Sequence, residues 1–213
     1  MEILVQLGPA RLTLLQVVPG RPGEAVRVHD ALRKLDPDLI CAELTLKEAL
    51  RVEDALLKGK EPEPQRFLEQ RLREGLTRFG RVEHRDPFAA AARYARENRL
   101  LYLPLSQGHH EPGPFTRLRF THHLRKTDLL AEDEEGYARA LDALAREDPK
   151  MGPRLLEEER LLAAKIEDVM EREQRTRVAA ILTYPRGERV AGHLREAGFG
   201  PARKDGLVPW ETR

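Results

Sequence analysis

Glu43 stands at the end of an apolar stretch, residues 39–44, that is typical of a buried β-strand. A carboxylate in such a place can have a raised pKa and act as a general base, or it can bind a metal ion. It can equally pair with an arginine or cap a helix that is expected to begin at Thr45. Glu43 is therefore the first candidate catalytic residue, and each of these roles stays open at this point.

A second group of polar side chains follows the last apolar stretch, residues 177–184. Tyr184 ends that stretch, and Arg186 and Arg189 come directly after it. Guanidinium groups bind a carboxylate or a phosphate through paired hydrogen bonds. We expect Arg186, Arg189 and Tyr184 to bind a ligand, the alternative being arginines exposed to solvent and a packed tyrosine with a wet hydroxyl.

Four histidines lie in one expected loop and the helix after it: His109, His110, His122 and His123. Imidazole is a common metal ligand, and a loop pair together with a helix pair could converge on one ion. Adjacent helical residues point about 100° apart, so at most one of His122 and His123 can face a given ion. Because no spacing here matches a zinc motif, we favour exposed histidines and expect no metal and no cofactor.

Apolar stretches alternate with segments of helical periodicity along most of the chain. Strands are expected at residues 2–6, 11–18, 39–44, 100–105 and 177–184, the first two forming a hairpin around a Gly-Pro turn. This alternation predicts an α/β fold with a mainly parallel sheet flanked by helices. Ligands bind such sheets beyond the carboxyl ends of the strands, which is where Glu43 and Arg186 fall.

The length of 213 residues suits one large domain, so we expect a single α/β domain over residues 1–213. Within it, residues 107–150 are expected to leave the sheet as a loop followed by two charged helices. The strongest helical pattern then covers residues 155–171, and Glu157 lies near its start. Acidic side chains in a first helical turn also complement the helix dipole, which explains them without a function.

The composition disfavours several classes of partner. Basic and acidic residues number 37 and 36, so no strong field exists to attract nucleic acid. No stretch approaches the roughly 18 apolar residues that a membrane span requires. With Cys41 as its single cysteine and no signal-like segment, the chain is expected to be cytoplasmic. Abundant Arg, Glu and Pro beside a single Asn resemble the composition of thermophilic proteins.

Several segments, in this order, resemble the TraB family and its Tiki metalloprotease and erythromycin-esterase-like relatives. The stretch PDLICAEL, residues 37–44, is similar to the family's Pro-Asp and following strand, which ends in Glu-Leu. Residues 88–105 resemble its middle helix and strand, and residues 157–166 resemble its long helix. The stretch AAILTYPRGERVAGHL, residues 179–194, resembles its last strand and Gly-x-Gly-His turn. The resemblance implies an α/β fold of this family and metal-assisted hydrolysis.

The two histidines of the family pattern are replaced in this chain. By spacing, the first falls on Gly20 and the second on Arg186, and the arginine of the helix motif falls on Glu158. Glu43 and Glu157 remain as the two residues that the resemblance assigns to catalysis. A catalytic metal normally has about three protein ligands, which two acids do not supply. We expect an ion pair between Glu43 and Arg186 where the metal would lie.

Two functions follow from these observations. The first is a non-catalytic TraB-like protein with a degenerate metal site, which binds a small anionic or peptide ligand or has an assembly role. In it, residues 116–146 cover the crevice or form a homodimer contact. The second is a metal-dependent hydrolase with a site rebuilt around Glu43. Loss of both histidine positions favours the first, and neither includes a nucleic-acid or membrane partner.

Overall fold

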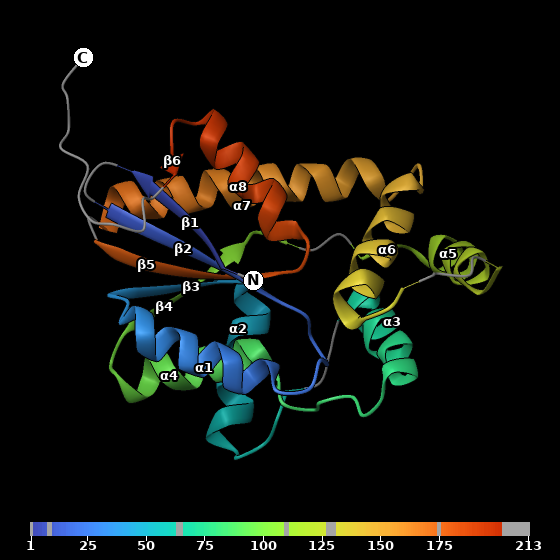
Figure 1. Ribbon diagram of the computed structural model, residues 1–213, viewed down its shortest axis with the longest axis horizontal. Helices are drawn as coiled ribbons and strands as arrows, with labels where there is room; N and C mark the ends of the chain where they lie inside the picture. The colour runs from blue at the N-terminus through green and yellow to red at the C-terminus, as the bar shows by residue number, and fades with distance from the viewer. Residues whose placement is uncertain are drawn as a thin grey trace.

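The computed structural model describes residues 2–7, 10–62, 66–108, 111–126, 131–173 and 176–201, which form a sheet with helices on both faces (Figure 1). The strands are β1 (Glu2–Leu7), β2 (Ala10–Val17), β3 (Leu39–Thr45), β4 (Leu101–Ser106), β5 (Arg177–Thr183) and β6 (Gly200–Pro201). The helices are α1 (Glu24–Leu35), α2 (Leu46–Leu57), α3 (Phe67–Leu76), the 3-10 helix η1 (Thr77–Phe79), α4 (Pro87–Glu97), α5 (Pro114–Lys126), α6 (Glu134–Glu147), α7 (Gly152–Glu173) and α8 (Arg186–Glu196).

The sheet has the strand order β4-β3-β5-β2-β1-β6. Strands β4, β3, β5 and β2 are parallel, whereas β1 runs antiparallel to β2 and β6 antiparallel to β1. The predicted α/β fold with a mainly parallel sheet is confirmed. Strands β2 and β3, which α1 connects, are separated by β5, so Leu12 and Leu39 both pair with Val178. The carboxyl ends of the four parallel strands therefore share one edge of the sheet.

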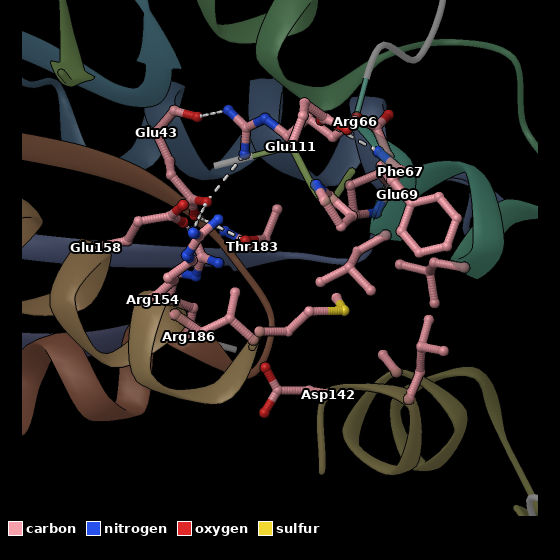
Figure 2. Close-up of a pocket in the computed structure, with 18 of the residues that line it drawn as sticks. Glu43, Arg66, Phe67, Glu69, Glu111, Asp142, Arg154, Glu158, Thr183 and Arg186 are labelled. Carbon is pink, nitrogen blue, oxygen red and sulfur yellow. Dashed lines mark hydrogen bonds and ion pairs between the residues drawn. The ribbon is translucent and has the colours of Figure 1, made fainter. Parts of the chain in front are cut away.

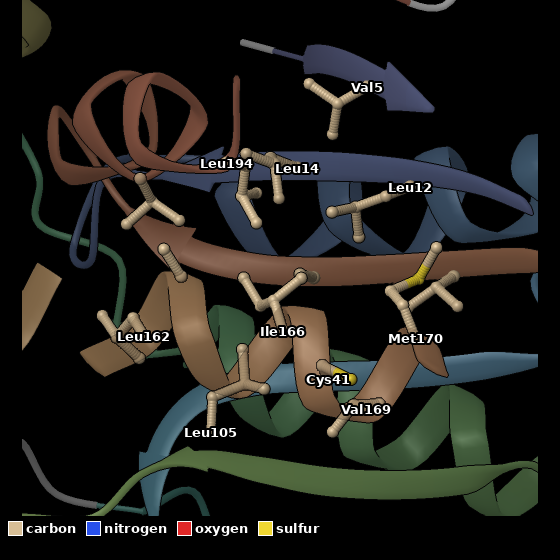
Figure 3. Close-up of a cluster of buried hydrophobic side chains, with 14 of the residues drawn as sticks. Val5, Leu12, Leu14, Cys41, Leu105, Leu162, Ile166, Val169, Met170 and Leu194 are labelled. Carbon is tan, nitrogen blue, oxygen red and sulfur yellow. The ribbon is translucent and has the colours of Figure 1, made fainter. Parts of the chain in front are cut away.

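Apolar side chains fill both faces of the sheet. Helices α7 and α8 cover one face, where Leu12 and Leu14 of β2 pack with Ile166 of α7 (Figure 3). Helices α1 and α4 cover the other face, where Leu15 of β2 is buried. Coverage on both faces explains why the strands are almost continuously apolar. Cys41 is buried in the first of these clusters, and burial raises the pKa of its thiol to about 12, which makes it an inert packing residue.

The Pro-Asp motif before β3 has a structural role at the opposite edge of the sheet. Asp38 accepts hydrogen bonds from the Thr176 hydroxyl at 2.9 Å and from the backbone N–H of Arg177 at 3.1 Å. These bonds tie the start of β3 to the start of β5. At the other end of β3, Thr45 and Glu48 form the expected capping box, which begins α2.

A third group of helices, α3, α5 and α6, lies beyond the carboxyl edge of the sheet (Figure 1). Helices α5 and α6 occupy the region that was expected to leave the sheet. Helix α3 joins them, which the sequence pattern did not indicate. The apolar cluster between these helices and the edge of the sheet includes Phe67, Leu72, Phe120, Tyr137 and Leu141. None of the helices that the structure describes is long and apolar enough to cross a membrane.

Candidate functional site

A cavity of about 480 Å³ lies where the carboxyl ends of β3 and β5 meet α3, α6 and α7 (Figure 2). Its volume is in the range of small-molecule binding sites, and its position is the one that parallel sheets use for ligands. The ionic side chains that line it include Glu43, Arg66, Glu69, Arg154, Glu158 and Arg186. The apolar lining includes Phe67, Leu72, Leu141, Met151 and Leu155.

Glu43 lies in the cavity wall with a fully buried side chain, and both of its carboxylate oxygens accept hydrogen bonds. Oε1 accepts from Nη1 of Arg186 at 2.7 Å and from Nη1 of Arg66 at 3.0 Å. Oε2 accepts from the backbone N–H of Thr183 at 2.8 Å and from its hydroxyl at 2.7 Å. The predicted ion pair between Glu43 and Arg186 is therefore present. The capping role at Thr45 belongs to Glu48 instead.

Arg66 is the second cation that pairs with Glu43, and the sequence analysis did not predict it. Besides the Glu43 carboxylate it contacts the backbone carbonyl of Glu43, and its Nε donates to Oε1 of Glu48 at 3.0 Å. Burial alone would lower the pKa of Arg66, but the carboxylates of Glu43 and Glu48 raise it above its usual value. Residues 59–64 have the composition of a surface linker, so nothing in the pattern indicated that Arg66, just after them, reaches β3.

Arg186, at the first position of α8, connects Glu43 to helix α7. Its Nη1 also lies 3.2 Å from Oε2 of Glu158, and its Nε lies 3.9 Å from Oε1 of Glu159. Burial opposes the charge of Arg186, yet Glu43 and Glu158 raise its pKa above the usual value. Of the three acids that open the predicted helix, Glu157 is exposed and does not line the cavity. The structure thus brings Glu158, not the expected Glu157, to the site, because each helical residue rotates by about 100°.

Arg189 lies behind the cavity wall and is not among its lining residues, contrary to the expected ligand-binding role. Its Nε lies 2.9 Å from Oε1 of Glu159, and its Nη2 lies 2.8 Å from Oδ2 of Asp142. Arg146 contacts both of the same acids. This network joins α6, α7 and α8, so Arg189 ties α6 to the two helices that cover one face of the sheet.

Tyr184 does line the cavity, at the end of β5. Its side chain is buried, and its hydroxyl accepts a hydrogen bond from Nε of Arg139 at 3.1 Å. The guanidinium of Arg139 also lies 5.5 Å from the centre of the tyrosine ring. A ligand in the cavity would therefore meet mainly the ring of Tyr184.

Glu69 lies on the α3 side of the cavity and has an unusual charge state. Burial and the nearby Asp86 raise its pKa to about 7, although Arg73 and Arg66 act in the opposite direction. The guanidinium of Arg73 donates to Glu69 at 3.2 Å and to Asp86 at 3.4 Å. One cation is thus shared between the buried Asp86 and the partly buried Glu69, so Glu69 titrates near neutral pH.

The positions of the two family histidines are taken by Gly20, which is closely packed, and by Arg186, which pairs with Glu43. Gly20 has a φ of +94°, and a Cβ there would lie 2.9 Å from Cγ of Arg73, so a histidine does not fit. His122 and His123 are exposed on α5, and His109 and His110 lie outside the described residues. Among the residues that the structure describes, no group of three or more histidine, cysteine, aspartate or glutamate side chains could hold a metal ion.

The cavity thus combines acids that pair with arginines, namely Glu43, Glu69 and Glu158, with apolar side chains from α3, α6 and the start of α7. A lining of this kind can position a ligand, and within the described part of the chain its most buried acid, Glu43, is held by two guanidinium groups. No protein-family model and no curated protein matches the sequence.

Proposed function

We propose that this chain is a non-catalytic, TraB-like protein that binds a small organic ligand in the cavity at the carboxyl edge of its sheet. One observation carries the proposal: the Glu43 carboxylate already accepts four hydrogen bonds, two of them from guanidinium groups. A general base needs a free acceptor, and a metal ligand needs a lone pair directed at the ion. Glu43 offers neither while Arg66 and Arg186 hold it.

The replaced histidines support the same proposal. Arg186 places a positive charge where the family resemblance has a metal ligand, and a cation repels a metal ion. At Gly20 the space for a side chain is taken by Arg73. The TraB-like assignment itself rests on the order of the sequence motifs, and a homodimer through residues 116–146 stays a prediction that sedimentation velocity tests.

Metal content tests the proposal. Protein without a histidine tag is incubated with zinc, manganese or cobalt, freed of excess metal, and subjected to elemental analysis and to ester and peptide hydrolysis assays. We expect no stoichiometric metal and no hydrolysis. Glu43→Gln is measured in parallel, with Glu53→Gln on the exposed side of α2 as the matched control. Stoichiometric metal that is lost only in folded Glu43→Gln would establish the alternative, a hydrolase rebuilt around Glu43.

A further inference from the structure

The ionic side chains that line the cavity fall into two groups, paired and unpaired. Its acids are paired: Glu43 and Glu158 with Arg186, Asp142 with Arg189, and Glu69 with Arg73. The remaining acid of the lining, Glu111, pairs with Arg117 at 2.7 Å. These pairs cancel most of the charge within the wall itself.

Two cations of the lining differ from the rest. The side chains of Lys150 and Arg154 line the cavity, and neither has a hydrogen-bond or ion-pair partner among the residues that the structure describes. They stand four residues apart on either side of Gly152, where α7 begins. The N-terminal end of this long helix adds a partial positive charge at the same place. The start of α7 therefore contributes two cations that form no ion pair with the residues that the structure describes.

A second part of the lining is apolar. Phe67 and Leu72 of α3, Leu141 of α6, and Leu155 of α7 form it, together with Met151. Figure 2 shows Arg154 grouped with Glu158 and Arg186 at one end, and the ring of Phe67 at the other end. A ligand that spans the cavity would therefore place one end among charged groups and the other among hydrocarbon.

We infer that the ligand is an amphipathic anion, with its carboxylate or phosphate group at Lys150 and Arg154 and its apolar body against α3 and α6. The inference rests on the proposed binding function and specifies its ligand class. Lysine and arginine both bind these anions through charge-assisted hydrogen bonds, and arginine can do so with two parallel bonds. A cationic ligand would meet two unpaired cations, and a fully polar ligand would leave the apolar wall exposed to water.

Isothermal titration with a matched set of compounds tests the ligand class. Decanoate, decyl phosphate, decanol, decylamine and inorganic phosphate are compared below their micelle concentrations. We expect decanoate or decyl phosphate to bind at least tenfold more tightly than decanol, and inorganic phosphate and decylamine not to bind measurably. Which of the two anions binds more tightly distinguishes a carboxylate from a phosphate ligand. Within the alkanoates, each added methylene group should raise affinity by up to about fourfold.

Variants test the position of the charged group. Lys150→Gln and Arg154→Gln should each weaken decanoate binding about tenfold while leaving decanol binding unchanged. Arg160→Gln, on an exposed position of the same helix, is the control and should change neither. The unfolding midpoint of each variant shows that the fold is intact.

The outcomes separate this inference from the proposed function. Equal binding of decanol and decanoate, or full binding by Arg154→Gln, would overturn the anion site and leave a binding role in place. Tighter binding of decylamine would overturn it in the same way. Stoichiometric metal in the Glu43 experiment would overturn the proposed function even where decanoate binds. Absence of binding by every compound would overturn the amphipathic anion as the ligand, while the metal analysis decides on the proposed function separately.

Discussion

The carboxylate of Glu43 and the guanidinium of Arg186 lie 2.7 Å apart, which ties the end of β3 to the first residue of α8 across the end of β5. Arg66 extends this connection to the start of α3, and Thr183 anchors the carboxylate to β5 itself. The acid at the end of a buried strand is thus the centre of a clamp that joins three segments distant in sequence. This clamp explains why an acid lies at the carboxyl edge of the sheet, and the explanation requires no catalytic role.

Glu43→Gln should destabilise the protein by about 3 kcal/mol, because removing one partner of a buried ion pair leaves the other charge incompletely compensated. This loss of stability should be smaller than for an isolated ion pair, because Arg66 still pairs with Glu48 and Arg186 still pairs with Glu158. Urea unfolding at pH 7 measures the change, with Glu53→Gln as control. An unchanged unfolding midpoint would show that the clamp contributes nothing to the folded state.

Thr183→Val should cost about 2 kcal/mol, because its hydroxyl donates to a charged and buried acceptor, Glu43. Thr183→Ser keeps the hydroxyl and should lose much less. The same urea experiment compares the two variants. Similar losses in both would mean that packing of the methyl group, and not the hydrogen bond, matters at this position.

The sequence was sufficient for most of the fold. Five of the strands, the capping box at Thr45 and the helix after Asp86 follow from local patterns of apolar spacing and capping. The pairing of Glu43 with Arg186 also followed, because both lie at the carboxyl ends of strands that were expected to be parallel. Local patterns, together with the rule that ligands bind beyond the carboxyl ends of parallel strands, therefore predict one edge of the cavity.

The rest of the site depends on tertiary contacts that leave no local signal. Helix α3 packs on α6 instead of covering the sheet, which brings Arg66 to Glu43, and no periodicity indicates that placement. Glu157 was expected in the site because of the family resemblance, and Arg189 because it follows the last strand together with Arg186. The position of Glu157 on the turn of α7 directs it to solvent, and that of Arg189 on α8 directs it toward Asp142. These orientations are set by how the two helices pack against α6 and the sheet.

Stability should fall as the pH rises toward neutrality, because of Glu69. Its pKa is about 7 in the native protein, against an ordinary value of 4.5. Between these values the unfolded chain releases a proton that the native protein keeps, so the free energy of unfolding decreases with rising pH. The contribution is about 3 kcal/mol and is fully lost above pH 7.

Urea unfolding from pH 4.5 to pH 8 measures this dependence in the wild type and in Glu69→Gln. The variant has no carboxyl group to titrate, so its stability should fall less over this range. The difference between the two curves isolates the contribution of Glu69, because only this carboxyl group differs between the two proteins. Parallel curves would mean that the Glu69 carboxylate is stabilised by Arg73 and is ionised throughout.

Gly75→Ala should lower the free energy of unfolding by about 2 kcal/mol, because a Cβ at this position of α3 would overlap the buried ring of Tyr137 in α6. This contact sets how closely α3 and α6 approach, and Leu141 of α6 lines the cavity one turn after Tyr137. Gly192→Ala is the matched control, since nothing lies within 4 Å of a Cβ there and alanine favours a helix by about 1 kcal/mol. Urea unfolding should therefore move the two variants in opposite directions. A stable Gly75→Ala protein would show that α6 can shift away from α3, and that the cavity between them is adjustable in width.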